Sequence, residues 1–429
     1  MSLVPPGARH VPAVGGTRAV PAPDPVARDY LLLALRLDQR IPGLVDGYFG
    51  PADLKAHVDI EQLLAPARLR DDAAALRARL PAEVGDPDRR SWLEVQLIAL
   101  ETQAAGLAGE SLPYLESVAR CFAFEPRRRP DAEFESAVAQ IDALLPGEGP
   151  VAERLAAWDA RFEVPVDRLA AILAWLVARF RARAASLFGL PEGEDLTVSL
   201  VTGQPWSGYN WFDGGRRSRV DINTDLPVHV EDLISTVAHE TYPGHHLEHA
   251  WKEADLVDDQ GRLESSVLLI NTPECLISEG LANLGRRFAA PADDRADLLV
   301  ELYERAGLAI STDRQAAQDA AERTAALAAA RHALGAIRGN AAILRHADGW
   351  SHDGVVDYLV TVGHDSPATA AKRVEYIDHP LWRTYVLVYA EGEALLERWV
   401  DAVPVADRAA RFGRLLHEQL TPASVRVPG

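Results

Sequence analysis

Apolar residues recur every three or four positions along most of this chain, and this periodicity restricts the possible folds more than any other sequence feature. Such spacing places apolar side chains on one face of an α-helix. It is clear in segments such as ARDYLLLALRLDQRI, DRRSWLEVQLIALETQAAGLA and DRLAAILAWLVARFRARAASLF, and Pro and Gly residues separate the segments. We therefore expect a mainly α protein built from packed amphipathic helices.

One stretch, residues 192–227, has a different pattern. LTVSLVTGQPWSGYNWFDGGRRSRVDINTD combines β-branched and aromatic residues with glycines, and polar and apolar residues alternate in SRVDINT. This predicts a small sheet of two or three strands beside the helix that follows, and no other segment has a convincing β pattern. We expect a loose leader at residues 1–25, an N-terminal helical region at 26–190 and a site-bearing region at 191–425. The last two should form one continuous structural domain.

Charge and hydropathy exclude two classes of partner. The chain has 44 Lys and Arg against 63 Asp and Glu, a net charge of −19, which repels nucleic acids and anionic membrane surfaces. The longest apolar run, Leu169 to Ala178, is well short of the roughly 20 residues that span a bilayer. The two cysteines, Cys121 and Cys275, lack metal-type or redox-type spacing, as expected for a cytoplasmic protein.

Four of the 13 histidines lie within the segment HETYPGHHLEH, and a Glu follows the first of them. Such clustering is typical of a metal site. In the HExxH motif the two histidines are four residues apart on one helix face, but here Pro243 is the fourth residue after His239. Pro243 and Gly244 predict a kink or bulge, so we interpret the segment as HExxH with two inserted residues. His245 is then the second ligand, and His246 is its close rival.

Two alternatives remain for this segment. In the first, the helix ends at Tyr242 and a second helix carries incidental histidines. In the second, His245, Glu248 and His249 form the inverted motif HxxEH, which needs no helix distortion. His245 is a metal ligand in the inserted and inverted motifs alike, so it is the most secure single assignment.

A catalytic zinc site needs a third protein ligand and an open position. Glu279 in TPECLISEGLANL is the best candidate for that ligand, and Glu274 is the alternative. Glu240 directly follows His239 and is the natural general base for a water molecule at the metal. We expect one Zn²⁺ ion as the cofactor.

These residues resemble a known family. HETYPGHHLEH followed by SEGLANL is similar to the HExxPGHH and EGWA signatures of the bacterial "domain of unknown function 885" family, although EGLAN here replaces EGWA. NAAILRHADGWSHDGVVDYL and LWRTYVLVYAEGEALLE resemble later family segments, so the resemblance covers roughly residues 200–420. Family members resemble zinc metallopeptidases with a fold similar to the helical Taq-type carboxypeptidases. The resemblance implies His239, His245 or His246, and Glu279 as ligands, with Glu240 as base.

The resemblance also implies how a substrate is held. A strand edge beside the zinc helix can pair with an extended peptide, which assigns Asp221 and Asn223 in SRVDINTD to substrate binding. Tyr389 and His346 are candidates to stabilise the oxyanion that forms at the attacked carbonyl. Arg383 is a candidate partner for a substrate carboxylate.

The sequence thus predicts a zinc-dependent hydrolase, a metallopeptidase that cleaves amide bonds by metal-activated water. The acidic surface favours neutral or basic peptides as substrates. One alternative is a zinc hydrolase that acts on a non-peptide ester or amide. Another is a non-enzymatic helical binding protein with no metal or with a structural metal, whose fourth ligand is His249 or Glu274.

Overall fold

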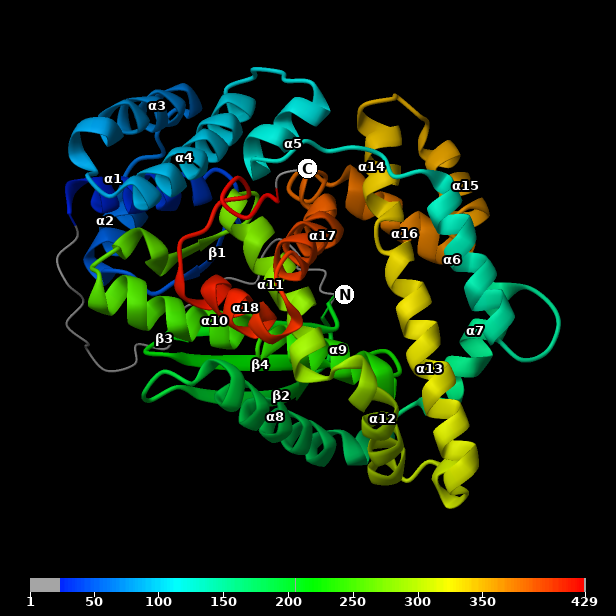
Figure 1. Ribbon diagram of the computed structural model, residues 1–429. Helices are drawn as coiled ribbons and strands as arrows, with labels where there is room; N and C mark the ends of the chain where they lie inside the picture. The colour runs from blue at the N-terminus through cyan, green and yellow to red at the C-terminus, as the bar shows by residue number, and fades with distance from the viewer. Residues whose placement is uncertain (1–23, 205, 428–429) are drawn as a thin grey trace.

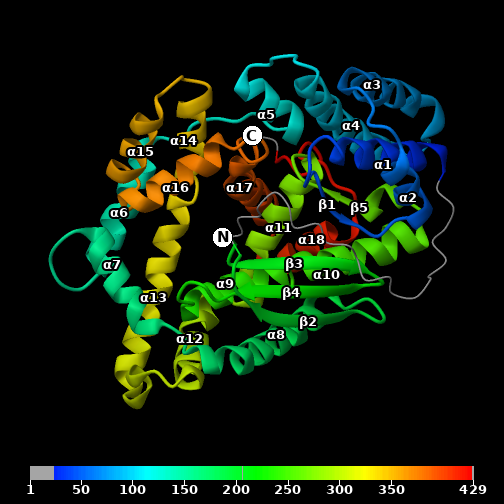
Figure 2. The ribbon, with the colours of Figure 1, turned by 180° about the vertical axis from the view of Figure 1, so that it is seen from behind.

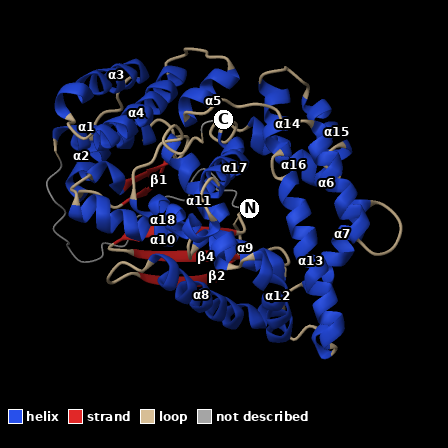
Figure 3. Ribbon diagram, viewed as in Figure 1, coloured by secondary structure: helices blue, strands red, loops and turns tan. Residues whose placement is uncertain are grey.

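The structure, a computed structural model, describes residues 24–204 and 206–427, and helices make up most of this part of the chain (Figure 1; Figure 3). The predicted mainly α fold class is therefore confirmed. Of the predicted leader, only Asp24 and Pro25 lie within the described residues. They cap and open the first helix, since the Asp24 side chain accepts a hydrogen bond from the amide of Ala27.

Helices α1–α5 form one end of the molecule, drawn in blue and cyan in Figure 1. The long helices α3 and α4 pack against each other, and α1 packs on α2 and α3. Pro at the first position begins α1, α3 and α4, where its missing N–H costs nothing. The bounds are α1 (Pro25–Asp38), α2 (Ala52–Ile60), α3 (Pro66–Glu83), α4 (Pro87–Leu107) and α5 (Tyr114–Phe122).

A second group of helices forms the opposite flank (Figure 1; Figure 2). The long helix α13 runs beside α6, and α14, α15 and α16 pack on one another. The bounds are α6 (Asp131–Leu144), α7 (Val151–Asp159), α12 (Ala292–Ala306), α13 (Arg314–Leu334), α14 (Ile337–His346), α15 (His352–Thr361) and α16 (Pro367–Asp378).

The predicted β segment forms a three-stranded sheet. Its strands are β2 (Asp195–Val201), β3 (Gly208–Gly214) and β4 (Arg217–Asn223). The order is β2-β4-β3, with β4 parallel to β2 and antiparallel to β3. SRVDINTD therefore lies on the central strand, and the prediction that it offers an edge to a substrate is wrong, because β4 is paired on both sides. The strand at the sheet edge near the site is β3.

A second, two-stranded sheet was not expected from the sequence. Strand β1 (Val45–Tyr48) pairs antiparallel with β5 (Val267–Leu269), more than two hundred residues later. Both strands are too short to show a period-two pattern, and their pairing is non-local, so nothing in either segment predicts the sheet. The pairing places β1, which follows the first helix, beside the same cavity as the HETYPGHHLEH segment.

The remaining helices surround the predicted site. Helix α11 lies between α9 and α17 and contacts both, while α9 and α10 pack on β3. The close crossing of α11 and α17 requires glycine, since a Cβ on Gly280 would lie 2.4 Å from the carbonyl carbon of Gly392. The bounds are α8 (Val166–Phe188), α9 (Val230–Glu240), α10 (His245–Lys252), α11 (Pro273–Ala289), α17 (Val388–Asp401) and α18 (Arg408–His417).

Two large buried apolar clusters form the core, and Trp206, Tyr209 and Trp211 form a third, small cluster. One large cluster joins α1–α5 to α14–α17, and the other joins α6–α10 to α11–α13 and α18, so neither coincides with a continuous half of the chain. Helix α11 contributes to both, through Leu276 and Leu281 respectively. Within the described ranges, every helix is too short or too polar to cross a membrane.

Candidate metal centre and active site

The HETYPGH segment forms a sharp corner between α9 and α10. Helix α9 ends at Glu240, the Tyr242–Pro243 peptide bond is cis, and His245 is the first residue of α10. The backbone at Gly244 turns so tightly that an added Cβ would lie 1.9 Å from the carbonyl oxygen of His239, a position only glycine can occupy. The distortion predicted between the two histidines is therefore present, and it takes the form of a break between two helices.

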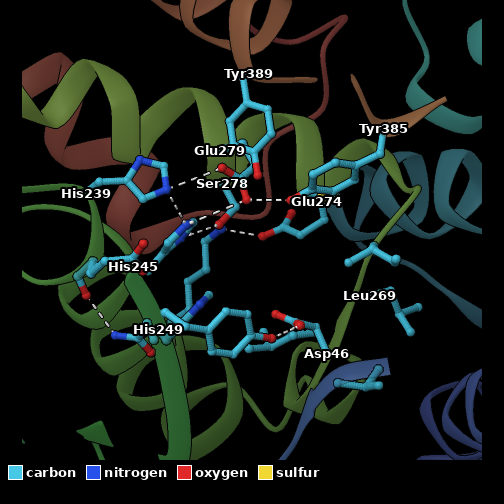
Figure 4. A pocket seen from close by; sticks show the side chains of 18 of the residues that line it. Asp46, His239, His245, His249, Leu269, Glu274, Ser278, Glu279, Tyr385 and Tyr389 are labelled. Carbon is cyan, nitrogen blue, oxygen red and sulfur yellow. Dashed lines mark hydrogen bonds and ion pairs between the residues drawn. The ribbon is translucent and has the colours of Figure 1, made fainter. Parts of the chain in front are cut away.

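The corner brings His239 and His245 together, with their imidazole rings perpendicular and their centroids 4.6 Å apart. Their Nε2 atoms are 3.1 Å apart. The alternative of two separate helices is therefore correct for the backbone, but the histidine on the second helix is not incidental, because its side chain meets that of His239. Glu279 of α11 completes a group of three with these histidines (Figure 4). We call His239, His245 and Glu279 the metal group, because they are the residues that could hold a metal ion. Its Oε2 lies 3.4 Å from Nε2 of His239, and its Oε1 lies 3.8 Å from Nε2 of His245.

These separations suit one zinc ion. Two ligand atoms, each about 2.1 Å from a tetrahedral zinc, are about 3.4 Å apart. The hydrogen bonding of the Glu279 carboxylate also favours a bound cation. Oε1 accepts a hydrogen bond of 2.6 Å from the Tyr385 hydroxyl, whereas Oε2 is buried and accepts none from the described residues. A buried carboxylate oxygen without a donor is costly, and a bound cation would satisfy it.

Outer partners orient both imidazoles. The Nδ1 atom of His239 donates to Oδ1 of Asn283 at 3.0 Å, because that amide oxygen can only accept, and this directs Nε2 toward the group. Nδ1 of His245 lies 3.2 Å from Oγ of Ser278, which donates to Oε2 of Glu248 at 2.5 Å. A carboxylate behind a histidine in this way fixes its tautomer and raises its basicity.

The electrostatics of the group favour positive charge. Burial lowers the pKa of His245, but the carboxylates of Glu248, Glu279 and Glu240 outweigh it and raise that pKa to about 9. Burial alone would raise the pKa of Glu279, yet the adjacent His239 and His245 lower it below its ordinary value. An anion and two imidazoles thus occupy a place where a divalent cation would be stabilised.

A second candidate group comprises His245, Glu248 and His249, the residues of the inverted motif. Its carboxylate is already occupied, since Oε1 of Glu248 accepts from Lys252 at 2.7 Å and Oε2 accepts from Ser278. The rings of His245 and His249 stack nearly parallel, with centroids 5.7 Å apart, instead of converging edge to edge. The geometry therefore favours the first group.

Glu274, the alternative third ligand, is also engaged. It accepts a hydrogen bond from the Trp92 indole at 2.8 Å and forms a close ion pair with Lys252. Because an ammonium already neutralises this carboxylate, Glu274 is a poorer metal ligand than Glu279.

His246, the rival second ligand, points away from the group. It is fully buried, with Nδ1 2.8 Å from Oγ of Ser218 and Nε2 3.0 Å from Oε2 of Glu194. The same carboxylate accepts from the Tyr242 hydroxyl at 2.5 Å and from Nε of Arg181 at 2.7 Å. His246 thus connects the corner to Ser218 of β4 and to Glu194 by hydrogen bonds, which is a structural role.

This network predicts a pH-dependent contribution to stability. Burial would raise the pKa of Glu194, but hydrogen bonds from His246 and Tyr242 lower it to about 2. The carboxylate therefore stabilises the fold fully above its ordinary pKa of about 4.5, and that contribution is lost as the pH falls toward 2. We expect Glu194→Gln to cost roughly 2 kcal/mol at pH 7, because buried partners lose a charged acceptor. Thermal unfolding should show this deficit shrinking between pH 5 and pH 3.

The matched control is Glu192→Gln, since Glu192 lies two residues earlier and is exposed. Its melting temperature should equal that of the wild type at every pH. A Glu194→Gln deficit that is absent at pH 7, or constant from pH 7 to pH 3, would contradict the assignment.

A cavity opens beside the metal group, and its walls come from segments far apart in the chain. It is lined by Asp46 of β1, by Tyr209 and Asn210 of β3, by the metal group, and by aromatic residues near α16 and α17. Tyr389 lines it and an adjoining hollow, as do His239 and Glu240. The metal group therefore stands at the junction of two hollows, where a substrate could extend in both directions.

Tyr389 is placed as predicted, next to the metal group. Burial and the nearby Glu279 hold its pKa well above 10, so its hydroxyl stays protonated and able to donate. A hydrogen bond with Tyr385 lowers that pKa again, but less than burial raises it. Tyr385, which packs edge-on against Tyr389, was not predicted and also holds Glu279.

Glu240 also lies in the shared part of the two hollows. Its side chain is only 5% exposed, and its Oε1 would lie 3.5 Å from a Cβ placed on Gly208 of β3. The side-chain amide of Asn210 donates to the Glu240 carbonyl at 2.8 Å, which satisfies a carbonyl at the end of α9. The candidate base is thus held between the metal group and the edge strand.

Four predicted residues lie elsewhere. His346 and Arg383 line a separate hollow beside Tyr114, and Nε2 of His346 donates to a backbone carbonyl, so neither can act at the metal group. Asp221 accepts from the Trp211 indole, and Asn223 donates to the carbonyl of Gln204. Both belong to the central strand and are used internally. The structure therefore does not bring these four residues to the metal group.

The structure also adds residues that the sequence did not indicate. Asn283 lies four positions after Glu279, and that helical spacing was a usable signal. Ser278 directly precedes Glu279 and carried no signal by itself. Asp46 and Arg338 reach the two hollows from distant segments, with no motif around either.

Comparison with known proteins informs the fold alone. No protein-family model matches the sequence, and no curated protein matches it. The fold is similar to that of the crystal structure of "the putative lipoprotein from Colwellia psychrerythraea", with a TM-score of 0.50 and 17% identity over 83% of this chain. This chain spans 65% of that protein's length. A structure named BsuCP matches with a TM-score of 0.36 and 10% identity, over 91% of this chain and 87% of that one.

Proposed function

We propose that this protein is a zinc-dependent hydrolase that cleaves amide bonds in peptides. The observation that carries the proposal is the group formed by His239, His245 and Glu279, with zinc-like separations and one buried carboxylate oxygen that lacks a donor. Zinc, when bound, supplies Lewis-acid polarisation of a carbonyl and acidifies a water molecule. The resemblance of HETYPGHHLEH and SEGLANL to the "domain of unknown function 885" family supports the same assignment.

The residues around this group suit acyl-transfer chemistry. Glu240 is placed to take the proton from the attacking water and to pass it to the leaving amine. The protonated hydroxyl of Tyr389 is placed to donate to the oxyanion. Tyr385 and Asn283 hold Glu279 and His239 in position, so the site is preorganised by hydrogen bonds.

The two hollows suit a short peptide. The edge strand β3 passes beside Glu240, where an extended peptide could lie along it. Arg338 lines the hollow beyond Tyr389 and forms no ion pair with the described residues. Burial and the neighbouring Arg373 lower the pKa of Arg338 to about 10, so it stays cationic at neutral pH. It is better placed than Arg383 to bind a substrate carboxylate.

A structural metal site is less well supported. Such sites are normally closed by four protein ligands. Among the described residues, the group at His239 has three, and His249 belongs to a different group that shares only His245. An open fourth position is what a catalytic site requires.

The proposal is tested by peptide hydrolysis with the metal removed and restored. Zinc-loaded protein should release new amino termini from unstructured peptides of three to six residues, and a zinc chelator should abolish this release. Added Zn²⁺ should restore it. A zinc-loaded protein that cleaves no peptide would refute the proposal, and cleavage of an ester alone would reassign the substrate class.

A further inference from the structure

Asp46 faces the metal-site cavity from an element outside the zinc motif. It lies on β1, which the pairing with β5 places at the cavity wall, and Figure 4 shows it on the side away from His239 and Glu279. The residue keeps an exposed surface, and it lines the cavity. A ligand in the cavity could therefore reach this carboxylate directly.

One oxygen of Asp46 is held by the protein and the other is available. The Tyr209 hydroxyl donates to Oδ1 in a short hydrogen bond. No Lys, Arg or His within residues 24–204 and 206–427 forms an ion pair with Asp46. Tyr209 thus fixes the orientation of the carboxylate without neutralising its charge.

Desolvation makes this unpaired charge unusual. The atoms that enclose the cavity desolvate Asp46 and raise its pKa to about 6, although the Tyr209 hydrogen bond and the nearby His245 lower it, so the group is ionised at neutral pH at some cost. A cationic partner in direct contact would recover that cost. His245 acts on Asp46 only at longer range, and no described residue forms an ion pair with it, which leaves a close partner to a ligand.

The other charges of the cavity are already assigned. Of its four lining carboxylates, Glu274 pairs with the one lining ammonium, Lys252, and Glu240 and Glu279 belong to the metal centre. Asp46 is the carboxylate that remains.

The surrounding rings also favour a cation. The lining includes Tyr376, stacked on Trp382 with centroids 5.7 Å apart, and Tyr385 lies edge-on to Trp382. Aromatic faces attract ammonium and guanidinium groups, and the attraction grows where water is excluded. An acidic group in a cavity that aromatic rings also line suits an organic cation better than a neutral chain.

We infer that Asp46, oriented by Tyr209, is the binding subsite for a cationic group of the substrate, an alkylammonium or a guanidinium. The inference rests on the proposed peptidase function and specifies its substrate class. Two sources offer this chemistry, the free α-amine of a short peptide and the side chain of Lys or Arg. Asp46 and the metal group line the same cavity, so a peptide held by either kind of cation could extend toward the metal group.

Binding measured in an inactive background tests the subsite without turnover. In Glu240→Gln protein loaded with zinc, calorimetry should show tighter binding of Leu-Gly-Gly than of acetyl-Leu-Gly-Gly, or of acetyl-Arg-Gly-Gly than of acetyl-Leu-Gly-Gly. The first contrast identifies the α-amine and the second the side chain. Adding Asp46→Asn should weaken binding of the preferred cationic peptide about 10-fold or more and leave the neutral peptide unchanged.

The matched control is Asp53→Asn, since Asp53 on α2 is exposed and lies outside the cavity. It should leave every affinity unchanged. Thermal unfolding of the Asp46→Asn protein checks that the fold is intact, and wild-type kcat/KM for the same peptides gives a second measure of selectivity. Equal affinities for cationic and neutral peptides, or a preference that survives Asp46→Asn, would overturn the subsite. So would the absence of binding by any cationic peptide.

The failure of the proposed function has a different signature. In that case zinc-loaded wild-type protein cleaves no peptide, while the binding contrasts still report on Asp46. If the wild type cleaves peptides without regard to their charge, the subsite fails and the hydrolase stands.

Discussion

Glu240→Gln is expected to reduce kcat for peptide hydrolysis by about 10³-fold while zinc content stays at the wild-type level. The amide has nearly the shape of the carboxylate but cannot take a proton from water. Glu240 lies in the part of the cleft shared by the two hollows and is not a member of the metal group. Its loss should therefore affect the proton transfer and leave the metal in place. Steady-state kinetics and metal analysis of the same preparation measure both effects.

The control for this variant is Asp232→Asn, which removes an exposed carboxylate from the same helix. It should retain full activity and full zinc content. Full activity in Glu240→Gln would contradict the role of Glu240 as base. Loss of zinc in that variant would instead place Glu240 among the metal ligands.

The sequence predicted the fold class and the three-stranded sheet because both depend on local patterns. Helical periodicity and capping are local, as in α11, where the Thr272 side chain accepts from the amide of Cys275 and Pro273 follows. The order of the strands is not local. The parallel pairing of β2 with β4, and that of β1 with β5, depend on the tertiary fold, so β4 could not be distinguished from an edge strand.

In the metal group, too, the sequence predicted the features that depend on local patterns and not those that depend on the tertiary fold. Clustering singled out His239 and His245, and the Pro243-Gly244 pair indicated a break, but its form depended on how closely Gly244 approaches the His239 carbonyl. His346 and Arg383 were candidates from the sequence, and the fold places them in another hollow. Asp46 could not be found from the sequence, because its place at the cavity depends on the pairing of β1 with β5.

The second large effect concerns zinc affinity. We expect His239→Asn, His245→Asn and Glu279→Gln each to lower it by more than the ~10–100-fold typical of outer-shell partners. Each change removes one of three converging ligand atoms. Ser278→Ala removes only the hydroxyl behind His245 and should fall within the outer-shell range. Titration with a competing zinc chelator measures all four affinities.

His249→Asn is the variant that separates the two metal geometries. If zinc binds at His239, His245 and Glu279, this change leaves the affinity near the wild-type value, because His249 belongs to the other group. If zinc binds in the inverted motif, His249→Asn abolishes binding and His239→Asn spares it. His245→Asn is damaging in both cases, so it verifies that the titration reports a specific site. The occupied carboxylate of Glu248 and the unsatisfied oxygen of Glu279 lead us to expect the first pattern.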